Sequence, residues 1–234
     1  SAHPKVGVVE DADPTVKSVA ASMTSWLKDP DALMALRYEL GRYIEGSRST
    51  LPVLEVSGGV HPKGKYYVNF QDPAGSPAAD PLVHEGKTYL KVGWDAYDAK
   101  KGYGWSGENI GKASIALFGY DDVGGFSEVQ RSYVYDDYGR PNLFEFALDP
   151  GKYKVTVGVG RPAKGYPNDP HNVSIEGVKI VDDQVTTSGA PLITKTTNVD
   201  VTDGSLSLVV GGKSATTGDF AYTFFAYLEI EPAS

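Results

Sequence analysis

The sequence predicts a mainly β protein, an antiparallel β-sandwich preceded by an N-terminal helical hairpin. Three observations indicate this fold class. From Leu51-Pro52 onward the apolar residues recur with a period of two, as in half-buried strands, whereas earlier they recur with the period of a helix. Turn signals that contain glycine separate the later stretches. The 234-residue chain also holds 27 glycines and 15 tyrosines, a composition that favours many short strands and turns.

The first fifty residues contain two helix-start signals. Asp13-Pro14 and Asp29-Pro30 each place a capping residue before a proline at the first helical position. The apolar residues after each signal form one stripe, so we expect helices over about 14–28 and 31–45, joined as a hairpin. We assign residues 1–55 to this hairpin or linker segment and residues 56–234 to the sandwich. The hairpin is a structural linker, or it packs on the sandwich or on a partner.

The sequence of the rest of the chain predicts strands separated by turns. In KYKVTVGV at 152–159, Tyr153, Val155 and Val157 alternate with polar residues, as a half-buried antiparallel strand requires. Strands that recur at short intervals, without helices between them, are typical of a sandwich. The expected strands cover residues 66–70, 88–93, 113–118, 143–148, 152–159, 172–177, 178–183, 196–201, 205–210 and 223–231.

Charge and composition exclude several classes of function. The net charge of -8 argues against nucleic-acid binding, which depends on Lys and Arg, and against docking on anionic membranes. No stretch reaches the roughly 20 apolar residues of a spanning helix. The absence of cysteine excludes disulfides and thiolate metal sites. We therefore expect neither a nucleic-acid partner nor a membrane partner.

Catalytic motifs are missing from the sequence. GWSG at 104–107 lacks the spacing of a nucleophile elbow, and the four histidines have no metal-site spacing. Because the chain has 30 acidic residues, some carboxylate pair will always resemble a glycosidase site, so that signal has little value. We expect this chain to be non-catalytic, and an esterase or lyase is the disfavoured alternative.

Two acidic turns offer oxygen ligands for a structural calcium ion. They are DDVGG at 121–125 and DDYGR at 136–140. Neither has the ligand spacing of an EF-hand, so we favour solvated turns, keep structural calcium as the alternative and assign no metal ligands. The sequon at Asn172 is interpreted as a chance match.

Aromatic and polar residues in the longer connections favour sugar binding. Sugars stack their C–H faces on Trp or Tyr rings and bond their hydroxyls to planar polar groups. The alternative for each ring is that it closes an end of the sandwich; we expect Trp94 and Tyr103 to be exposed and at least one ring of 101–105 to seal the fold. The candidate ligand-binding residues on these grounds are Trp94, Tyr103, Trp105, Tyr135, Arg161, Tyr166, Asn168 and His171.

An ordered series of segments over roughly 64–232 resembles the malectin-like, galactose-binding-like β-sandwich domains. These domains occur as carbohydrate-binding modules and as non-catalytic parts of secreted polysaccharide-degrading enzymes. The segments are YYVNFQ, KKGYGW, FEFALDPGKYKVTVGVG, HNVSIEGVKIVDD, VDVTDGSLSLVV and AYLEIE.

The resemblance implies a jelly-roll sandwich and a function. By position it points to Tyr103, to Tyr133 or Tyr135, to Arg161 and Tyr166, and to Asp219 before the last strand. It implies a non-catalytic module that targets a secreted bacterial enzyme or surface protein to a polysaccharide, beside adjacent modules of the same polypeptide. The alternative is a structural or protein-interaction sandwich beside a catalytic module.

Overall fold

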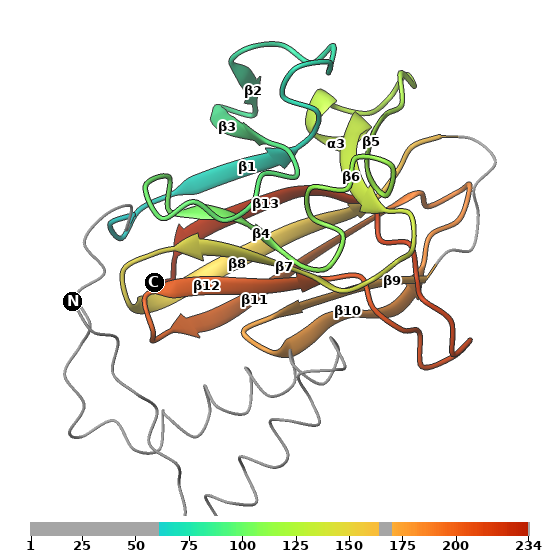
Figure 1. Ribbon diagram of the computed structural model, residues 1–234. Helices are drawn as coiled ribbons and strands as arrows, with labels where there is room; N and C mark the ends of the chain where they lie inside the picture. The colour runs from blue at the N-terminus through green and yellow to red at the C-terminus, as the bar shows by residue number, and fades with distance from the viewer. Residues whose placement is uncertain (1–60, 164–169, 234) are drawn as a thin grey trace, which may run out of the picture. The chain divides into compact units, whose positions relative to one another are not determined.

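Two β-sheets make up the part of the chain that the computed structural model describes, residues 61–163 and 170–233 (Figure 1). The larger sheet has the order β11-β8-β13-β1-β3-β2, with β6 joined to β13 and β5 joined to β6. Its strands are β11 (Leu192–Val201), β8 (Gly151–Gly160), β13 (Phe225–Pro232), β1 (Tyr66–Phe70), β3 (Lys87–Val92), β2 (Leu82–His84), β6 (Ser132–Asp136) and β5 (Ala116–Tyr120).

The second sheet has five strands in the order β10-β9-β12-β7-β4. They are β10 (Val178–Val185), β9 (Pro170–Ile175), β12 (Ser205–Val210), β7 (Asn142–Ala147) and β4 (Tyr103–Ser106). One short helix, α3 (Glu128–Arg131), lies between β5 and β6 along the chain. The predicted helices at 14–28 and 31–45 lie outside the described residues, and the division of the chain near residue 55 stays a prediction.

Strand β8 is paired on both of its edges, and along it buried residues alternate with exposed ones. Tyr153, Val155 and Val157 are fully buried, whereas Lys152 and Lys154 are exposed. The strand pairs over its whole length with β11 and over most of it with β13, both antiparallel. The expectation for residues 152–159 is therefore confirmed.

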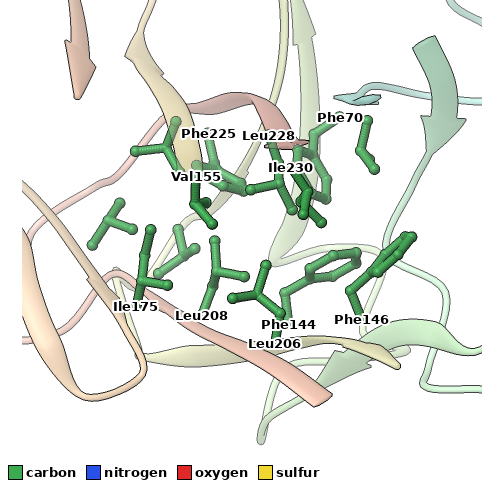
Figure 2. Packing of buried hydrophobic residues seen from close by; sticks show 14 of the residues in the cluster. Phe70, Phe144, Phe146, Val155, Ile175, Leu206, Leu208, Phe225, Leu228 and Ile230 are labelled. Atoms are coloured by element: carbon green, nitrogen blue, oxygen red, sulfur yellow. The ribbon is translucent and has the colours of Figure 1, made fainter. Parts of the chain in front are cut away.

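The core lies between the two sheets (Figure 2). The larger sheet contributes Phe70 and Phe225, and the second sheet contributes Phe144, all with essentially no exposure to solvent. The Phe70 ring lies 5.0 Å from the Phe144 ring and 4.6 Å from the Phe225 ring. Rings from opposite sheets are thus in contact, and the protein is a β-sandwich, as predicted.

Several details of the fold differ from the expectation, and β2 and β4 lie where no strand was expected. β1 and β3 pair in parallel, so the larger sheet is mixed. The predicted connection 119–142 contains α3 and β6, because its segment SYVYD extends the sheet by pairing with β5 and β13. The strand expected at 113–118 is displaced to Ala116–Tyr120.

Candidate functional site

The structure separates the predicted binding residues toward opposite ends of the sandwich. Tyr103 pairs with Phe146 near the end of β7, shortly before β8 begins at Gly151. Arg161 directly follows Gly160, the last residue of β8. A ten-residue strand spans about 30 Å, so these two side chains do not serve one small ligand.

The two tryptophans are held by the core. Trp105 is 1% exposed, and its indole Nε1 donates to the carbonyl oxygen of Gly93 at 2.9 Å. Trp94 is half-buried; its ring centroid lies 4.5 Å from that of Trp105, and its Nε1 donates to the carbonyl of Leu117 at 2.9 Å. Trp105 is therefore not a ligand-binding residue at the surface, and Trp94 is not the freely exposed ring that the sequence predicts. Both rings seal the fold.

Tyr103 has a similar packing role at its end of the sandwich. It is half-buried, and its ring stacks on Phe146 with 6.1 Å between the centroids and an angle of 13° between the planes. His61 stacks on the same Phe146 ring at 4.2 Å. These three rings close the end of the sandwich, so Tyr103 is less exposed than predicted.

The other end of the sandwich brings predicted residues together around Phe224. The guanidinium carbon of Arg161 lies 4.8 Å from the centre of the Phe224 ring. Tyr135 and Tyr133 pack on the same ring, with centroids at 5.1 Å and 5.2 Å. His171 meets it edge-on at 5.8 Å. We call Tyr133, Tyr135, Arg161, His171 and Phe224 the Phe224 cluster.

Hydrogen bonds fix the arginine of this cluster. Arg161 Nη1 donates to the hydroxyl of Tyr133 at 3.2 Å. Burial raises the pKa of Tyr133 to about 12, and the nearby Asp121 carboxylate adds to this effect while Arg161 opposes it. The Tyr133 hydroxyl therefore stays protonated, and the guanidinium is held between this hydroxyl and the Phe224 ring. Such a planar group, with its direction fixed, suits the recognition of ligand oxygens.

His171 supports the cluster from inside. It is fully buried and bonds through Nδ1 to the carbonyl of Tyr222 at 3.0 Å and through Nε2 to Thr186 Oγ1 at 3.1 Å. Burial lowers the pKa of His171 to about 4. The ring is thus neutral near pH 7 and anchors the segment before Phe224. The His171 ring, predicted to contact a ligand, is therefore buried within the fold and positions this segment.

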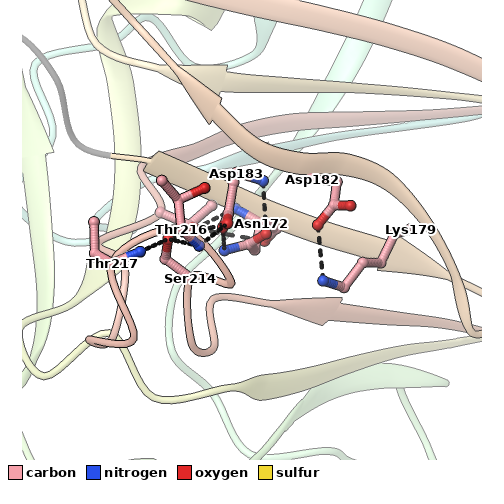
Figure 3. Close-up of polar contacts among 8 residues, drawn as sticks. Asn172, Lys179, Asp182, Asp183, Ser214, Thr216 and Thr217 are labelled. Atoms are coloured by element: carbon pink, nitrogen blue, oxygen red, sulfur yellow. Dashed lines mark hydrogen bonds and ion pairs between the residues drawn. The ribbon is translucent and has the colours of Figure 1, made fainter.

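The loop before the last strand is tied to β10 by Asp183 (Figure 3). One carboxylate oxygen of Asp183 accepts from Ser214 Oγ and from the Thr216 backbone N–H, both at 3.0 Å. The other accepts from Asn172 Nδ2 at 3.0 Å. Asp219, the predicted binding acid, is exposed in this loop, and the backbone N–H of Ser214 donates to its carbonyl. Tyr166 and Asn168 lie outside the described residues.

The acidic turns proposed for calcium have other contacts. Asp136 is 5% exposed and accepts from Asn109 Nδ2 at 2.8 Å and Asn142 Nδ2 at 3.0 Å, so it is not the solvated side chain that we favoured. Asp122 is exposed and pairs with Arg131 at 3.2 Å. Within residues 61–163 and 170–233, no three His, Cys, Asp or Glu side chains gather to hold a metal ion.

Asn172 of the sequon is also engaged in the fold. It is 5% exposed within β9, and its amide bonds to Asp183 through both its oxygen and its nitrogen. A buried strand position does not suit glycosylation, so the interpretation of this sequon as a chance match is supported.

The central ring of the cluster was not among the predicted site residues. Phe224 lies in the expected final strand 223–231, next to the core residue Phe225. In a regular strand, adjacent side chains point to opposite faces. The FF pair in the sequence therefore carried a signal: when one phenylalanine is in the core, the other lies on the outer face.

This chain is similar to parts of several solved structures. Protein YXIM from Bacillus subtilis aligns with 73% of this chain and 40% of its own, at 26% identity and a TM-score of 0.46. The ANX2 ectodomain from Arabidopsis thaliana aligns with 70% of this chain and 48% of its own, at 13% identity and a TM-score of 0.48. A calcium-binding mutant of β-glucuronidase 2 from Bacteroides uniformis aligns with 75% of this chain and 19% of its own, at 12% identity and a TM-score of 0.50.

The sequence itself has no comparable match, since no family model and no curated protein matches this chain. In the parts of the chain that the structure describes, no helix has the length and apolar character needed to cross a lipid bilayer. The chain spans less than half the length of each structure named above. The similarity to the β-glucuronidase, at a TM-score of 0.50 and 12% identity, concerns the fold alone.

Proposed function

We propose that this chain is a non-catalytic carbohydrate-binding module, and that it attaches a secreted bacterial enzyme or surface protein to a polysaccharide. The observation that carries the proposal is the Phe224 cluster, where one fixed guanidinium that follows β8 and two tyrosines of β6 surround a single ring. Adjacent modules of the same polypeptide would supply any catalysis.

The chemistry of the cluster fits a sugar better than a charged macromolecule. Half-buried tyrosine rings offer apolar faces, and Tyr135 is such a ring on β6. Arg161 presents N–H donors in a fixed plane, a geometry that suits hydroxyl and ring oxygens. Tyr222 adds a side chain that is 39% exposed, in the segment that His171 anchors.

The orientation of these groups limits the cost of binding. A ligand loses affinity when flexible side chains must be ordered upon binding. In the Phe224 cluster the guanidinium already rests on an aromatic ring and a tyrosine hydroxyl, and His171 already holds the neighbouring backbone. The site is therefore preorganised although it is shallow.

A binding screen tests this proposal. The full chain is run in affinity electrophoresis against soluble plant and microbial polysaccharides, with and without a calcium chelator, and the polysaccharides that bind are titrated by calorimetry. Arg161→Met and Tyr135→Ala should each weaken binding about tenfold or more, because each removes a directed contact worth on the order of 1–2 kcal/mol. A loss of binding in the chelator would assign a structural calcium ion.

Tyr97→Ala is the matched control. The Tyr97 side chain is 37% exposed. Its backbone N–H donates to the carbonyl of Trp105, and the residue lies outside the Phe224 cluster. Its replacement should leave the dissociation constant unchanged. The proposal fails if no polysaccharide binds, or if folded Arg161→Met and Tyr135→Ala proteins bind as well as the wild type.

A further inference from the structure

The outer face of β13 continues from the Phe224 cluster along the larger sheet. Phe225, Leu228 and Ile230 point into the core. The pairing register with β8 shifts between Phe225 and Tyr227. This bulge places Phe224 and Tyr227 on the same outer face although they are three positions apart in the sequence, and Glu229 and Glu231 follow on that face.

The Tyr227 ring lies flat across the sheet. A Cβ atom at position 158 would collide with this ring, so it covers the backbone of β8 at Gly158. Its hydroxyl reaches Thr194 Oγ1 on β11 at 2.9 Å. Tyr227 also packs against the hydrophobic group of Tyr133, Phe224 and Ala226. Tyr227 also packs against the hydrophobic group of Leu82, Tyr89 and Val129, so only the remaining part of this half-buried ring faces solvent.

Beyond Tyr227, two carboxylates are held in fixed positions. Glu229 pairs with Lys87 Nζ at 2.6 Å and accepts a short hydrogen bond from the Tyr89 hydroxyl. Glu231 pairs with Lys154 Nζ at 2.8 Å and accepts from the Tyr67 hydroxyl at 3.0 Å. Each glutamate therefore has one lysine and one tyrosine, and the strip is electrically balanced.

The strands β11, β8, β13 and β1 are neighbours in the larger sheet (Figure 1). Register pairs join Tyr67 to Glu229, Glu229 to Thr156, and Thr156 to Thr196 across four strands of the larger sheet. Thr196 and Thr194 on β11 are exposed. From Phe224 to Glu231 the outer face of β13 extends for about 20 Å. We call Tyr227, Glu229, Glu231, Thr156, Thr194 and Thr196, together with the paired Lys87 and Lys154, the sheet-face strip.

We infer that the sheet-face strip and the Phe224 cluster form one elongated surface for an internal segment of a neutral polysaccharide chain. This inference rests on the proposed function and adds to it the class of ligand. One sugar ring stacks on Tyr227, and its neighbours along the chain bond to the glutamates, lysines and threonines. The balanced charges favour a chain without uronic acids, and the length favours chain binding over recognition of a single terminal sugar.

A chain-length series tests the inference. The probes are neutral disaccharides and hexasaccharides of the cello, xylo and manno series, titrated into the full chain. The hexasaccharide that binds should do so at least about tenfold more tightly than its disaccharide. Thr196→Arg places a long cation across the strip at an exposed position, so it should reduce hexasaccharide affinity to that of the disaccharide. Tyr227→Phe should retain most of the affinity, because the stacking ring remains.

Thr88→Arg serves as the control, since Thr88 is exposed on β3 at a position that alternates with Tyr89 and thus lies on the opposite face. The inference is overturned if both chain lengths bind with equal affinity, or if Thr196→Arg leaves the hexasaccharide affinity unchanged. It is also overturned if galacturonate hexamers bind more tightly than the neutral hexasaccharides. If Arg161→Met weakens binding of both lengths and Thr196→Arg leaves both unchanged, the proposed function stands and the elongated surface fails. If nothing binds, the proposed function itself fails.

Discussion

His171 shows how a single interior position determines both the tautomer and the charge of a side chain. The Tyr222 carbonyl can only accept, so His171 Nδ1 carries the hydrogen and Nε2 accepts from the Thr186 hydroxyl. Burial opposes protonation of the ring and lowers its pKa to about 4, against an ordinary value of 6.5. A residue that the sequence places among ligand contacts is therefore a neutral anchor for the backbone beside Phe224.

This anchor predicts a pH dependence of stability. Between pH 6.5 and pH 4 the unfolded chain binds a proton at His171 that the folded chain does not, so the free energy of unfolding decreases as the pH falls. The contribution of His171 amounts to about 2 kcal/mol between pH 7 and pH 5. Urea unfolding at these two pH values should show this decrease in the wild type, and His171→Gln should lack it.

His84→Gln provides the comparison, because His84 is a half-buried histidine on β2, away from the Phe224 cluster. The His84→Gln protein should retain the decrease in the free energy of unfolding that His171 causes between pH 7 and pH 5. The assignment of His171 is wrong if His171→Gln shows the same loss of stability between pH 7 and pH 5 as the wild type.

At the scale of elements, Asp183 joins β10 to the loop before the last strand. Asp183 has a positive φ of 47° in β10, where the pairing with β9 is irregular, and this turns its carboxylate toward the loop. Burial acts to raise the pKa of Asp183, but hydrogen bonds from Asn172, Thr216 and Ser214 outweigh burial and lower the pKa to about 2. The carboxylate therefore holds the loop in its ionised form.

Asp183→Ala should release this loop. Removal of the carboxylate leaves Ser214 Oγ without its acceptor and leaves the Thr216 N–H with Ser214 Oγ as its remaining acceptor, so hydrogen exchange of the amides at 214–218 should become faster. In the wild type the same effect should occur as the pH falls from about 4 toward 2, because a lowered pKa means that protonation costs stability. Mass spectrometry of peptides that cover the loop measures both effects.

Asp182→Ala is the matched control for this experiment. Asp182 is the preceding residue, but its carboxylate is exposed and pairs with Lys179 at 2.7 Å, away from the loop (Figure 3). An exposed ion pair adds little stability, so exchange at 214–218 should not change. Equal exchange in the Asp183→Ala protein and the Asp182→Ala protein would show that Asp183 does not hold the loop.

At the scale of the whole molecule, Trp105 connects the two sheets of the sandwich. It belongs to β4 of the second sheet, and its ring centroid lies 5.4 Å from Phe70 and 6.3 Å from Phe225 of the larger sheet. Trp94 covers this ring from the outer side and is itself only half-buried. Both rings contribute to stability, but replacing the buried Trp105 removes more contact than replacing the half-buried Trp94.

Trp105→Ala should lower the free energy of unfolding by about 3–5 kcal/mol, the usual cost of removing a large buried ring. Trp94→Ala should cost less, because part of that ring already faces water. Chemical denaturation followed by circular dichroism measures the difference. A larger loss for Trp94→Ala than for Trp105→Ala would contradict the burial of the two rings.

The alternation of residues along the chain determined the class of fold. The strands at Gly151–Gly160 and Ser205–Val210 follow from this alternation, because it depends only on neighbours in sequence. The same pattern does not determine pairing partners, so the parallel pair of β1 and β3 was missed, and so was β6 within a predicted connection. The aromatic and arginine content of the connections indicated sugar binding, and this remains the proposed function.

Only the tertiary structure decided which rings face solvent. Trp94, Tyr103 and Trp105 stand among glycines and polar residues, yet they pack on rings that are distant in sequence. Phe224 and Tyr227 share one outer face because a bulge shifts the register of β13. The burial of a side chain in a loop depends on contacts between remote segments and on strand register. A sequence read locally therefore determines which residues form strands and which chemistry is available, and the packing of the sheets determines where that chemistry is exposed.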